Sequence, residues 1–499
     1  MKKIAICTLI VFFASYPLLD HAYRTGSVLT DAAHASETDA SPMAQVGHPT
    51  FVSPHASPIR VVGNLVFVVN TPADTVDVIN AKTRQIETRI NVGVDPVSLA
   101  VRPDNKEVWV SNHVSDSVSV IDSDSSSPTF LQVIDTIQEF DLETRATRFD
   151  EPVGIAFANN TKAYVALSSE NKIAIIDVAT RTVTGRLNIT AQDPREIIVR
   201  NNRLYVIPFE SNNKTQLSGG TGDLDGDLVT FNAYEHAIAN NNVLSLGAVV
   251  DIVKHPKVPD RDLFVFDTET DRLVETVNTL GTLLYGITVD SKGRVYVAQT
   301  DARNEVNGRA GTKKHGLVEL ENRAFLNRIT SVLPRTNAKS KKLKYEAEVD
   351  FIDLEPLPPE HPDPDAALAT PFAIEVSDDD STLFVSAAGS DQFFTVDAKS
   401  GEVLGRVKVD AVPRGIALQK NDSGSTQQAW TLNAVANTVS LVDVSDPKTP
   451  KVIASISLDD PTHPAVKRGR IAFNTASSST TRTFSCASCH PDGHTDQLL

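Results

Sequence analysis

Residues 486–490, near the C-terminus, read C-A-S-C-H, the C-x-x-C-H spacing that attaches haem c. On a helix, positions i, i+3 and i+4 share one face, so Cys486 and Cys489 can bond the two vinyl groups while His490 ligates the iron. The alternatives are a local disulfide or two zinc ligands. Zinc prefers four ligands and only His494 adds one nearby, and disulfide frameworks normally use more cysteines. We therefore predict a covalently bound haem c.

A second candidate site is the run D-L-D-G-D at residues 223–227, in which Asp223, Asp225 and Asp227 alternate around other residues. Carboxylates spaced in this way can wrap a calcium ion, and Glu235 lies near the place of a closing bidentate ligand. The glycine is at the fourth position rather than the sixth, so an exposed acidic turn explains the pattern about as well. Both interpretations stay open.

Other motifs with a known chemistry do not occur in the sequence. The glycine-rich residues 218–222 are not followed by the Lys-Ser or Lys-Thr of a phosphate-binding loop. Neither a G-x-S-x-G elbow nor an H-E-x-x-H zinc motif is present. The aspartates at 378–380 fall on a predicted hairpin turn, where turn chemistry explains them. No catalytic residue is assigned.

The charge of the chain narrows the range of partners. Its 499 residues are 41% hydrophobic and 22% charged, with a formal net charge of −16. This excess of acid argues against nucleic acid and anionic membranes as partners, because both require basic patches. An acidic surface suits a cationic redox partner protein.

The N-terminus predicts export. Two lysines precede an apolar stretch, residues 4–19, which is too short and too interrupted by Pro17 for a membrane span. The A-H-A at 33–35 is a cleavage candidate, with an uncleaved anchor as the alternative. We expect residues 1–35 to be a signal peptide or anchor, residues 36–57 a linker, and the protein to be periplasmic, in the cell envelope or extracellular. Export agrees with haem c, which is attached outside the cytoplasm.

Between these ends the sequence repeats about every forty-two residues. Each unit holds four short runs rich in Val, Ile and aromatic residues, with alternating polarity and turn residues between them, which predicts four antiparallel strands. Four strands per roughly forty residues are typical of a propeller blade. We predict an all-β, seven-bladed β-propeller over residues 58–460. The seven second strands are residues 67–70, 109–112, 164–167, 205–208, 296–299, 384–387 and 430–433.

Three insertions interrupt the repeat, at residues 209–261, 300–315 and 333–370. Loops of this length inside a compact domain are usually functional or mobile. The last contains a basic run at 339–344 and a proline-rich run at 356–364. We expect both to be solvated surface loops, with partner docking as the alternative.

Four histidines stand apart from any motif: His113, His236, His255 and His315. We expect each to be a surface or hydrogen-bonded histidine rather than a ligand. One of them at the mouth of the propeller can still face the haem.

The repeats resemble the YVTN family of β-propellers over about residues 58–458. The resemblance rests on strands such as Tyr164-Val165-Ala166-Leu167 and on first strands that mostly open on proline. Propellers of this kind mostly present binding surfaces, and the fold does not name a reaction.

The segment 466–496 is similar to the opening of the first cytochrome c domain of the di-haem cytochrome c peroxidase family. The likeness rests on the haem motif with the flanking Phe484-Ser485 and Pro491-Asp492-Gly493. It implies that the two cysteines of the motif form thioethers and that His490 is the proximal iron ligand. That family also needs a second C-x-x-C-H and a distal ligand, and neither follows here.

We expect residues 461–499 to begin a cytochrome c domain that is incomplete in this sequence. The chain would then be a fragment, an early-terminated reading frame or a half completed by another chain. The predicted function is electron transfer or peroxidase-type oxidoreductase chemistry, with the propeller as the surface for a redox partner or small-molecule substrate. The alternatives are a non-catalytic envelope propeller with a vestigial haem motif, and a catalytic propeller holding a metal in its own channel.

Overall fold

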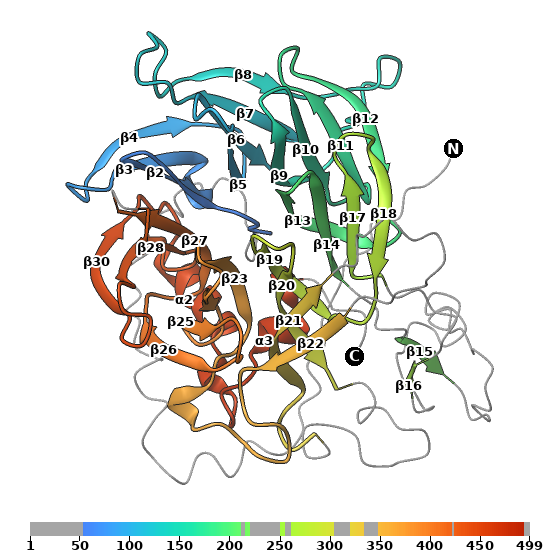
Figure 1. Cartoon of the computed structure of the whole chain (residues 1–499), viewed down its shortest axis with the longest axis vertical. Coiled ribbons are helices and arrows are strands. Elements are labelled where there is room, and N and C mark those ends of the chain that lie inside the picture. Colours follow the sequence, from blue (N-terminus) through green and yellow to red (C-terminus); the bar gives the residue numbers. More distant parts are fainter. Residues whose placement is uncertain are drawn as a thin grey trace, which may run out of the picture. The chain divides into compact units, whose positions relative to one another are not determined.

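The computed structural model describes residues 53–210, 215–219, 250–254, 261–303, 320–333, 348–421 and 424–493. Within them the repeat units form four-stranded antiparallel blades, arranged as a seven-bladed propeller (Figure 1). Blades 4 and 5 share one sheet because Glu210 of one pairs with Leu283 of the other. The predicted fold class is confirmed.

Consecutive strands pair within each blade, from an inner strand at the central channel to an outer strand at the rim. Blade 1 contains β1 (Ile59–Val62), β2 (Leu65–Asn70), β3 (Thr75–Asn80) and β4 (Ile86–Asn91). Blade 2 contains β5 (Pro96–Val101), β6 (Glu107–Asn112), β7 (Ser117–Asp122) and β8 (Val133–Ile137). Blade 3 contains β9 (Pro152–Asn159), β10 (Lys162–Leu167), β11 (Lys172–Asp177) and β12 (Thr182–Asn188). Blade 4 contains β13 (Gln192–Arg200), β14 (Arg203–Glu210), β17 (Leu263–Asp267) and β18 (Arg272–Val277), and blade 5 contains β19 (Leu283–Val289), β20 (Val295–Ala302), β21 (Phe325–Leu333) and β22 (Glu348–Asp353). Blade 6 contains β23 (Pro371–Val376), β24 (Thr382–Ala387), β25 (Gln392–Asp397) and β26 (Val403–Lys408). Blade 7 contains β27 (Pro413–Lys420), β28 (Thr426–Asn433), β29 (Thr438–Asp443) and β30 (Lys451–Ser457).

Burial falls from the centre of the ring to its rim. Every residue of β6 is buried, whereas most of β8, in the same blade, is exposed. Neighbouring blades cover both faces of the inner strands, which therefore carry nearly continuous apolar runs. Trp109 on β6, for example, is fully buried and meets the ring of Phe157 in the next blade edge to face, with centroids 4.9 Å apart.

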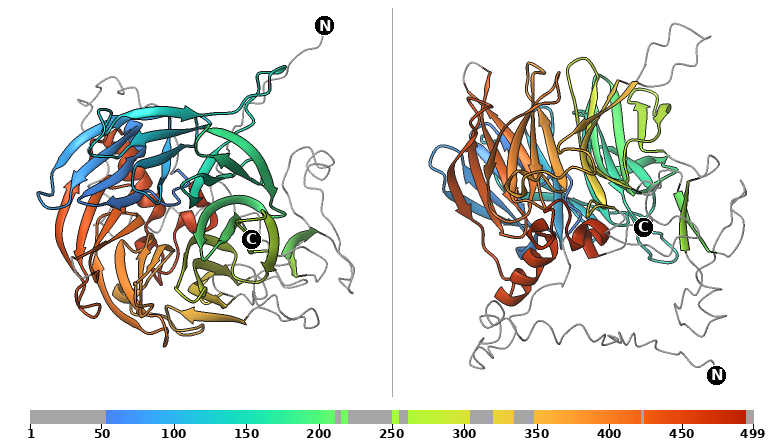
Figure 2. Two further views of the ribbon diagram at one scale, coloured as in Figure 1. Left: turned by 45° about the horizontal axis from the view of Figure 1, so that its top comes forward. Right: turned by 90° about the horizontal axis from the view of Figure 1, so that it is seen from below.

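The inner strands close a ring around the channel. β1, β5, β9, β13, β19, β23 and β27 contact one another in that order, and β27 contacts β1 again (Figure 2). No strand is exchanged at the seam, so packing closes it. The buried Trp430 belongs to the same core cluster as Ile59, and Asn437 donates to Asn70 at 3.1 Å. Gly415 lets the strands approach, because a Cβ there would lie 2.5 Å from Pro58 Cγ.

The aspartates at 378–380 are turn residues, as predicted. They connect β23 to β24, and Asp379 accepts hydrogen bonds from the Ser377 hydroxyl at 2.6 Å and the Ser381 amide at 3.1 Å. Asp380 has a φ of 60°, a conformation that aspartate tolerates in turns.

Most of the predicted insertion 209–261 lies outside the described residues, and residues 300–302 of the predicted insertion 300–315 belong to β20. The long insertion of blade 4 lies between β14 and β17 and contains a hairpin of β15 (Thr215–Gly219) and β16 (Val250–Lys254). The predicted insertion 333–370 was wrong in part, because residues 348–353 form β22, the outer strand of blade 5. Most of β22 is exposed at the rim, so its sequence lacks the apolar run that marks inner strands.

Beyond the last blade, two short helices lie at one face of the propeller (Figure 2). α2 (Pro464–Asn474) begins with a proline at its first turn, where no backbone donor is lost, and the side chain of His463 caps it. α3 (Cys486–Cys489) follows after an extended link that includes the turn η4 (Ala476–Ser478). No helix in the described part of the chain has the length and apolar character needed to cross a bilayer.

Candidate functional site

The C-x-x-C-H residues form one helical turn. α3 comprises Cys486 to Cys489, and the amide of His490 donates to the Cys486 carbonyl at 3.0 Å, which continues the helical pattern. Cys486 and His490 are exposed, Cys489 is partly buried, and the two thiols do not form a disulfide. The spacing therefore places all three side chains on one turn, as the sequence predicted.

Blade 5 carries this turn on an apolar surface. Cys489 and Phe484 pack against a small core cluster made of Ala302, Leu320, Ala324 and Phe325. The segment before α3 is fixed by hydrogen bonds: Asn327 donates to the Thr483 carbonyl at 3.0 Å, and the Thr481 hydroxyl donates to the Asn322 carbonyl at 2.8 Å. The Cys489 side of α3 thus faces the propeller, and the Cys486 side faces solvent.

The turn after the motif inserts an aspartate into the propeller. Asp492 lies in η5 (Pro491–Gly493), and its side chain is only 6% exposed. Asp492 Oδ2 accepts from Arg195 Nη1 at 2.5 Å, and Oδ1 accepts from Arg414 Nη1 at 2.8 Å. Arg195 is on β13 of blade 4 and Arg414 on β27 of blade 7. Because these blades are not neighbours, the two arginines can meet only over the axis of the ring, at the end where inner strands begin, which we call the mouth.

An aromatic arc supports the two guanidinium groups. Arg195 lies 3.6 Å from the ring centroid of Phe209, and Arg414 lies 4.7 Å from that of Phe372. Tyr285 stands between these rings, with centroids at 5.4 Å and 5.0 Å. Arg195 is also paired with Asp193 at 2.7 Å, and Arg414 donates to the Ser53 carbonyl at 3.2 Å.

The electrostatics of the mouth favour an ionised Asp492. Burial alone raises the pKa of its carboxyl, but the charges and hydrogen bonds of Arg414 and Arg195 outweigh burial and leave the pKa below its usual value. Burial lowers the pKa of Arg195, and Asp193 and Asp492 outweigh it, so the net shift is upward. Asp492 and Arg195 therefore stay charged across the physiological range.

Two histidines at the mouth are held neutral. Burial, followed by the charge of Arg414, lowers the pKa of His55 to about 3. Burial, followed by the charge of Arg195, lowers the pKa of His113 to about 4. His113 was predicted as an isolated surface or hydrogen-bonded histidine, with a place at the mouth as the other option, and it lies at the mouth. His236, His255 and His315 lie outside the described residues.

Asp492, Arg195 and Arg414 together are called the clamp below. A second polar layer crosses the channel next to it. The Ser57 hydroxyl donates to Glu196 Oε1 at 2.7 Å and accepts from Arg60 Nη2 at 2.6 Å, and Arg60 Nη1 pairs with Glu375 Oε1 at 3.1 Å. These residues come from blades 1, 4 and 6, so the contacts again span the axis. Burial raises the pKa of Glu196 to about 7, and Ser57 and Arg60 only partly oppose it.

The sequence analysis did not predict that Arg195, Arg414 and Asp492 meet at the mouth. A signal was present: the residue after the opening proline is arginine in two repeats, Pro194-Arg195 and Pro413-Arg414, but apolar or aromatic elsewhere. The predicted calcium ligands Asp223, Asp225 and Asp227 lie outside the described residues, so that prediction is untested. Among the residues that are described, no cluster of three His, Cys, Asp or Glu side chains is arranged to hold a metal ion.

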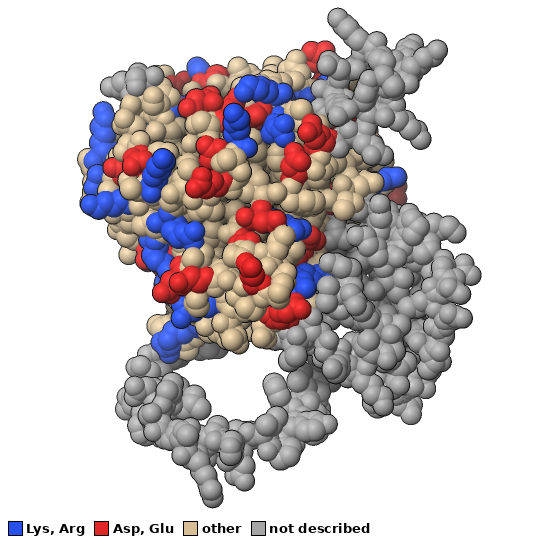
Figure 3. Space-filling view, turned by 60° about the horizontal axis from the view of Figure 1, so that its bottom comes forward, with Lys and Arg blue, Asp and Glu red and all other residues tan. Residues whose placement is uncertain are grey.

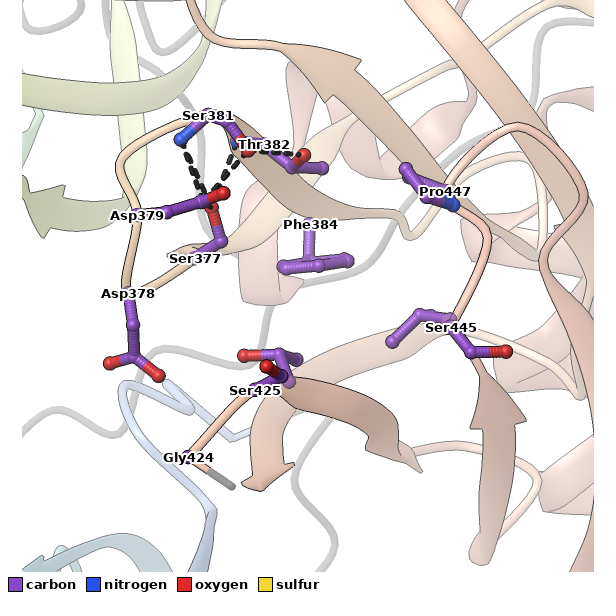
Figure 4. A pocket seen from close by; sticks show the side chains of 12 residues that line it. Ser377, Asp378, Asp379, Ser381, Thr382, Phe384, Gly424, Ser425, Ser445 and Pro447 are labelled. Carbon is purple, nitrogen blue, oxygen red and sulfur yellow. Dashed lines mark hydrogen bonds between the residues drawn. The ribbon is translucent and has the colours of Figure 1, made fainter. Parts of the chain in front are cut away.

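A separate hollow of about 500 Å³ lies between blades 6 and 7 (Figure 4). It is formed by the β23–β24 and β27–β28 hairpins and by the turn between β29 and β30, which lie at the end of the blades opposite the mouth. Its lining contains the ring of Phe384 and the hydroxyl-bearing residues Ser377, Ser381, Thr382, Ser425, Thr426 and Ser445. On the face shown in Figure 3, acidic and basic side chains are interspersed, without one dominant acidic patch.

Comparisons with known proteins concern the propeller. A family model of YNCE-like β-propellers matches residues 48–143. No curated protein matches this chain. Hydrazine synthase from Kuenenia stuttgartiensis has a similar structure, with a TM-score of 0.53 and 18% identity over 80% of this chain and 97% of that chain. Streptogramin B lyase aligns with a TM-score of 0.45 and 13% identity over 77% of this chain and 93% of that chain. The likeness to the hydrazine synthase shows the fold alone.

Proposed function

We propose that this protein is an exported c-type haem protein that performs electron transfer or peroxidase-type oxidoreductase chemistry, with the propeller as the scaffold for a redox partner or a small-molecule substrate. The observation that carries the proposal is the turn at α3, which presents two thiols and an imidazole at i, i+3 and i+4 on the surface of the propeller.

The residues present fit a covalently bound iron porphyrin. Cys486 and His490 are exposed, so both have room for a large group, and neither cysteine is consumed in a disulfide. Cys489 adjoins an apolar cluster around Phe325 and Phe484, which suits the edge of a macrocycle. Such a group, when bound, supplies one-electron and peroxide chemistry at iron.

Each side chain has a defined task in attachment. Cys486 and Cys489 would hold the porphyrin through thioether bonds to its two vinyl groups, formed by addition of S–H across each C=C bond without an oxidant. The imidazole of His490 would be the protein ligand of the iron. Asp492, two residues later, is locked in the propeller mouth and orients the end of α3 relative to the channel.

Haem attachment is tested by expressing the full chain with its N-terminus in a host that exports it and matures c-type cytochromes. We expect a Soret band, a haem-staining band that survives denaturation, and added porphyrin mass on the peptide containing Cys486 and Cys489. The double variant Cys486→Ala/Cys489→Ala is the control and should lose all three signals. A colourless wild-type protein would refute the redox proposal.

A binding module without catalysis is the second candidate, and the hollow between blades 6 and 7 favours it. Its lining combines the apolar ring of Phe384 with hydroxyl-bearing serine and threonine residues, a mixture that suits a small ligand with hydrogen-bonding groups. If the protein binds a ligand without haem, substitution of Phe384, Ser425 or Ser445 should weaken that binding. Unchanged binding in these variants would contradict this site. A protein that binds haem and shows no ligand binding at this hollow would favour the redox function.

A further inference from the structure

We infer that the mouth of the propeller is a carboxylate-binding site, and that Asp492 is its in-chain occupant, which positions the C-x-x-C-H turn over the channel. The inference goes beyond the proposed function, because it concerns how the C-terminal segment is held whether or not the thiols carry haem. It rests on the contacts of the clamp, the ion pairs of its arginines and the backbone at Asp492.

The contacts match a carboxylate atom by atom. Each oxygen of Asp492 takes a different guanidinium group, Oδ2 from Arg195 at 2.5 Å and Oδ1 from Arg414 at 2.8 Å. Charge-assisted hydrogen bonds of this kind are short and directional. The propeller therefore offers one donor to each side of a planar, two-oxygen anion.

The propeller builds the receptor without help from the C-terminal segment. Asp193 and the ring of Phe209 hold Arg195, while the Ser53 carbonyl and the ring of Phe372 hold Arg414. All of these groups belong to the blades or to the chain that leads into blade 1. Both arginines would thus keep their places if Asp492 were withdrawn.

The ion pairs of the two arginines also favour an anion at this place. Arg195 pairs with both Asp193 and Asp492, so it keeps one carboxylate if Asp492 is withdrawn. Among the described residues Arg414 has its ion pair with Asp492, and the nearby Asp95 accepts from the Ser53 hydroxyl instead. Withdrawal of Asp492 therefore leaves the buried Arg414 guanidinium without a carboxylate partner, which is unfavourable in a site of low dielectric.

The backbone is bent to deliver this carboxylate. Asp492 has a φ of 52°, in the left-handed region that most side chains avoid and that Asp and Asn tolerate better. Only Pro491 separates it from His490, so the clamp restricts the end of α3 to within about 7 Å of a fixed point. Asp492 is therefore a positioning residue for the thiols and the imidazole.

The test compares three full-length variants. Asp492→Gly removes the carboxylate, accepts the same φ and leaves room for a small anion. Asp492→Asn keeps the shape and the backbone conformation but loses the charge. The control is Asp365→Asn, because Asp365 pairs with Arg482 on the surface and is 91% exposed. The readout is hydrogen exchange of the peptide covering residues 481–493, relative to peptides of blades 1 to 3, with and without sodium acetate.

In Asp492→Gly we expect exchange in the 481–493 peptide to rise about 100-fold, as for loss of one member of a buried ion cluster, while the blades are unchanged. Acetate should restore most of the protection in this variant, and chloride or acetamide at equal concentration should not. Asp492→Asn should lose protection without acetate rescue, and Asp365→Asn should match the wild type. Equal exchange in wild type and Asp492→Gly, or no difference between acetate and acetamide, would overturn the inference. Because apoprotein suffices, failure of haem attachment leaves this test intact.

Discussion

Arg195 and Arg414 occupy the same position in two repeats, directly after the proline that opens the inner strand, and they meet on the carboxylate of Asp492. Blades 5 and 6 separate the two repeats in the ring, so equivalent positions have been brought face to face across the channel. A residue outside the propeller completes the pair. The mouth is therefore closed by the segment that carries the C-x-x-C-H turn.

Loss of either arginine should destabilise the protein far more than loss of a surface cation. Arg414→Ala leaves Asp492 buried with half of its charge compensation, and we expect the free energy of unfolding to fall by about 3 kcal/mol. Lys420→Ala breaks the exposed pair with Asp378 and should cost less than about 1 kcal/mol. Urea denaturation of both variants measures the difference, and equal costs would contradict the role given to the clamp.

The neutral His55 and His113 should make the free energy of unfolding depend on pH in the acidic range. The pKa of His113 is about 4 in the folded protein and near 6.5 when unfolded, so between these values the unfolded chain binds more protons. Stability should therefore decrease as pH falls from 6.5 to 4, by about 1.4 kcal/mol per pH unit for this residue, with His55 acting in the same direction. His113→Gln should flatten the slope of unfolding free energy against pH. An unchanged slope would show that His113 is not held neutral.

Glu196 should act with the opposite sign. Its pKa is about 7 in the folded protein and near 4.5 when unfolded, so between these values the folded protein binds more protons and its stability falls as pH rises. Glu196→Gln cannot ionise and keeps the acceptor for Ser57. We expect the stability of this variant relative to wild type to improve by roughly 1 kcal/mol per pH unit from pH 5 to 7. Glu402→Gln, at an exposed carboxylate, is the control and should show no such trend.

Two glycine variants separate close packing from helix propensity. A Cβ on Gly154 would lie 2.2 Å from the Arg195 carbonyl oxygen, so Gly154→Ala must push blade 3 from blade 4 and should cost about 1–3 kcal/mol. Gly469 lies in α2 with open space around its Cα, and Gly469→Ala should stabilise that helix by about 0.5–1 kcal/mol. Thermal unfolding measures both. A neutral Gly154→Ala would mean that the inner strands can separate at no cost.

The repeat made the propeller predictable because strand periodicity and turn residues are local properties. The second strands at Trp109, Tyr164 and Trp430 lie where the alternation placed them, and the turn at Asp379 follows from its own side-chain hydrogen bonds. The outer strand β22 was missed because an exposed rim strand has little apolar signal. The i, i+3, i+4 geometry of Cys486, Cys489 and His490 was likewise readable, since one helical turn is set by spacing alone.

The chemistry of the mouth could not be read in the same way. Asp492 is 297 residues from Arg195 and 78 residues from Arg414 along the chain, and each of the three by itself is an ordinary charged residue. Their meeting depends on the ring closing with β27 against β1 and on the C-terminal segment returning over the axis. Local sequence thus specified the blades and the helical turn of the C-x-x-C-H motif. Closure of the ring decided which charges are buried together. A buried charge needs a partner at a fixed position, whereas a pair of charges at the surface contributes little to stability.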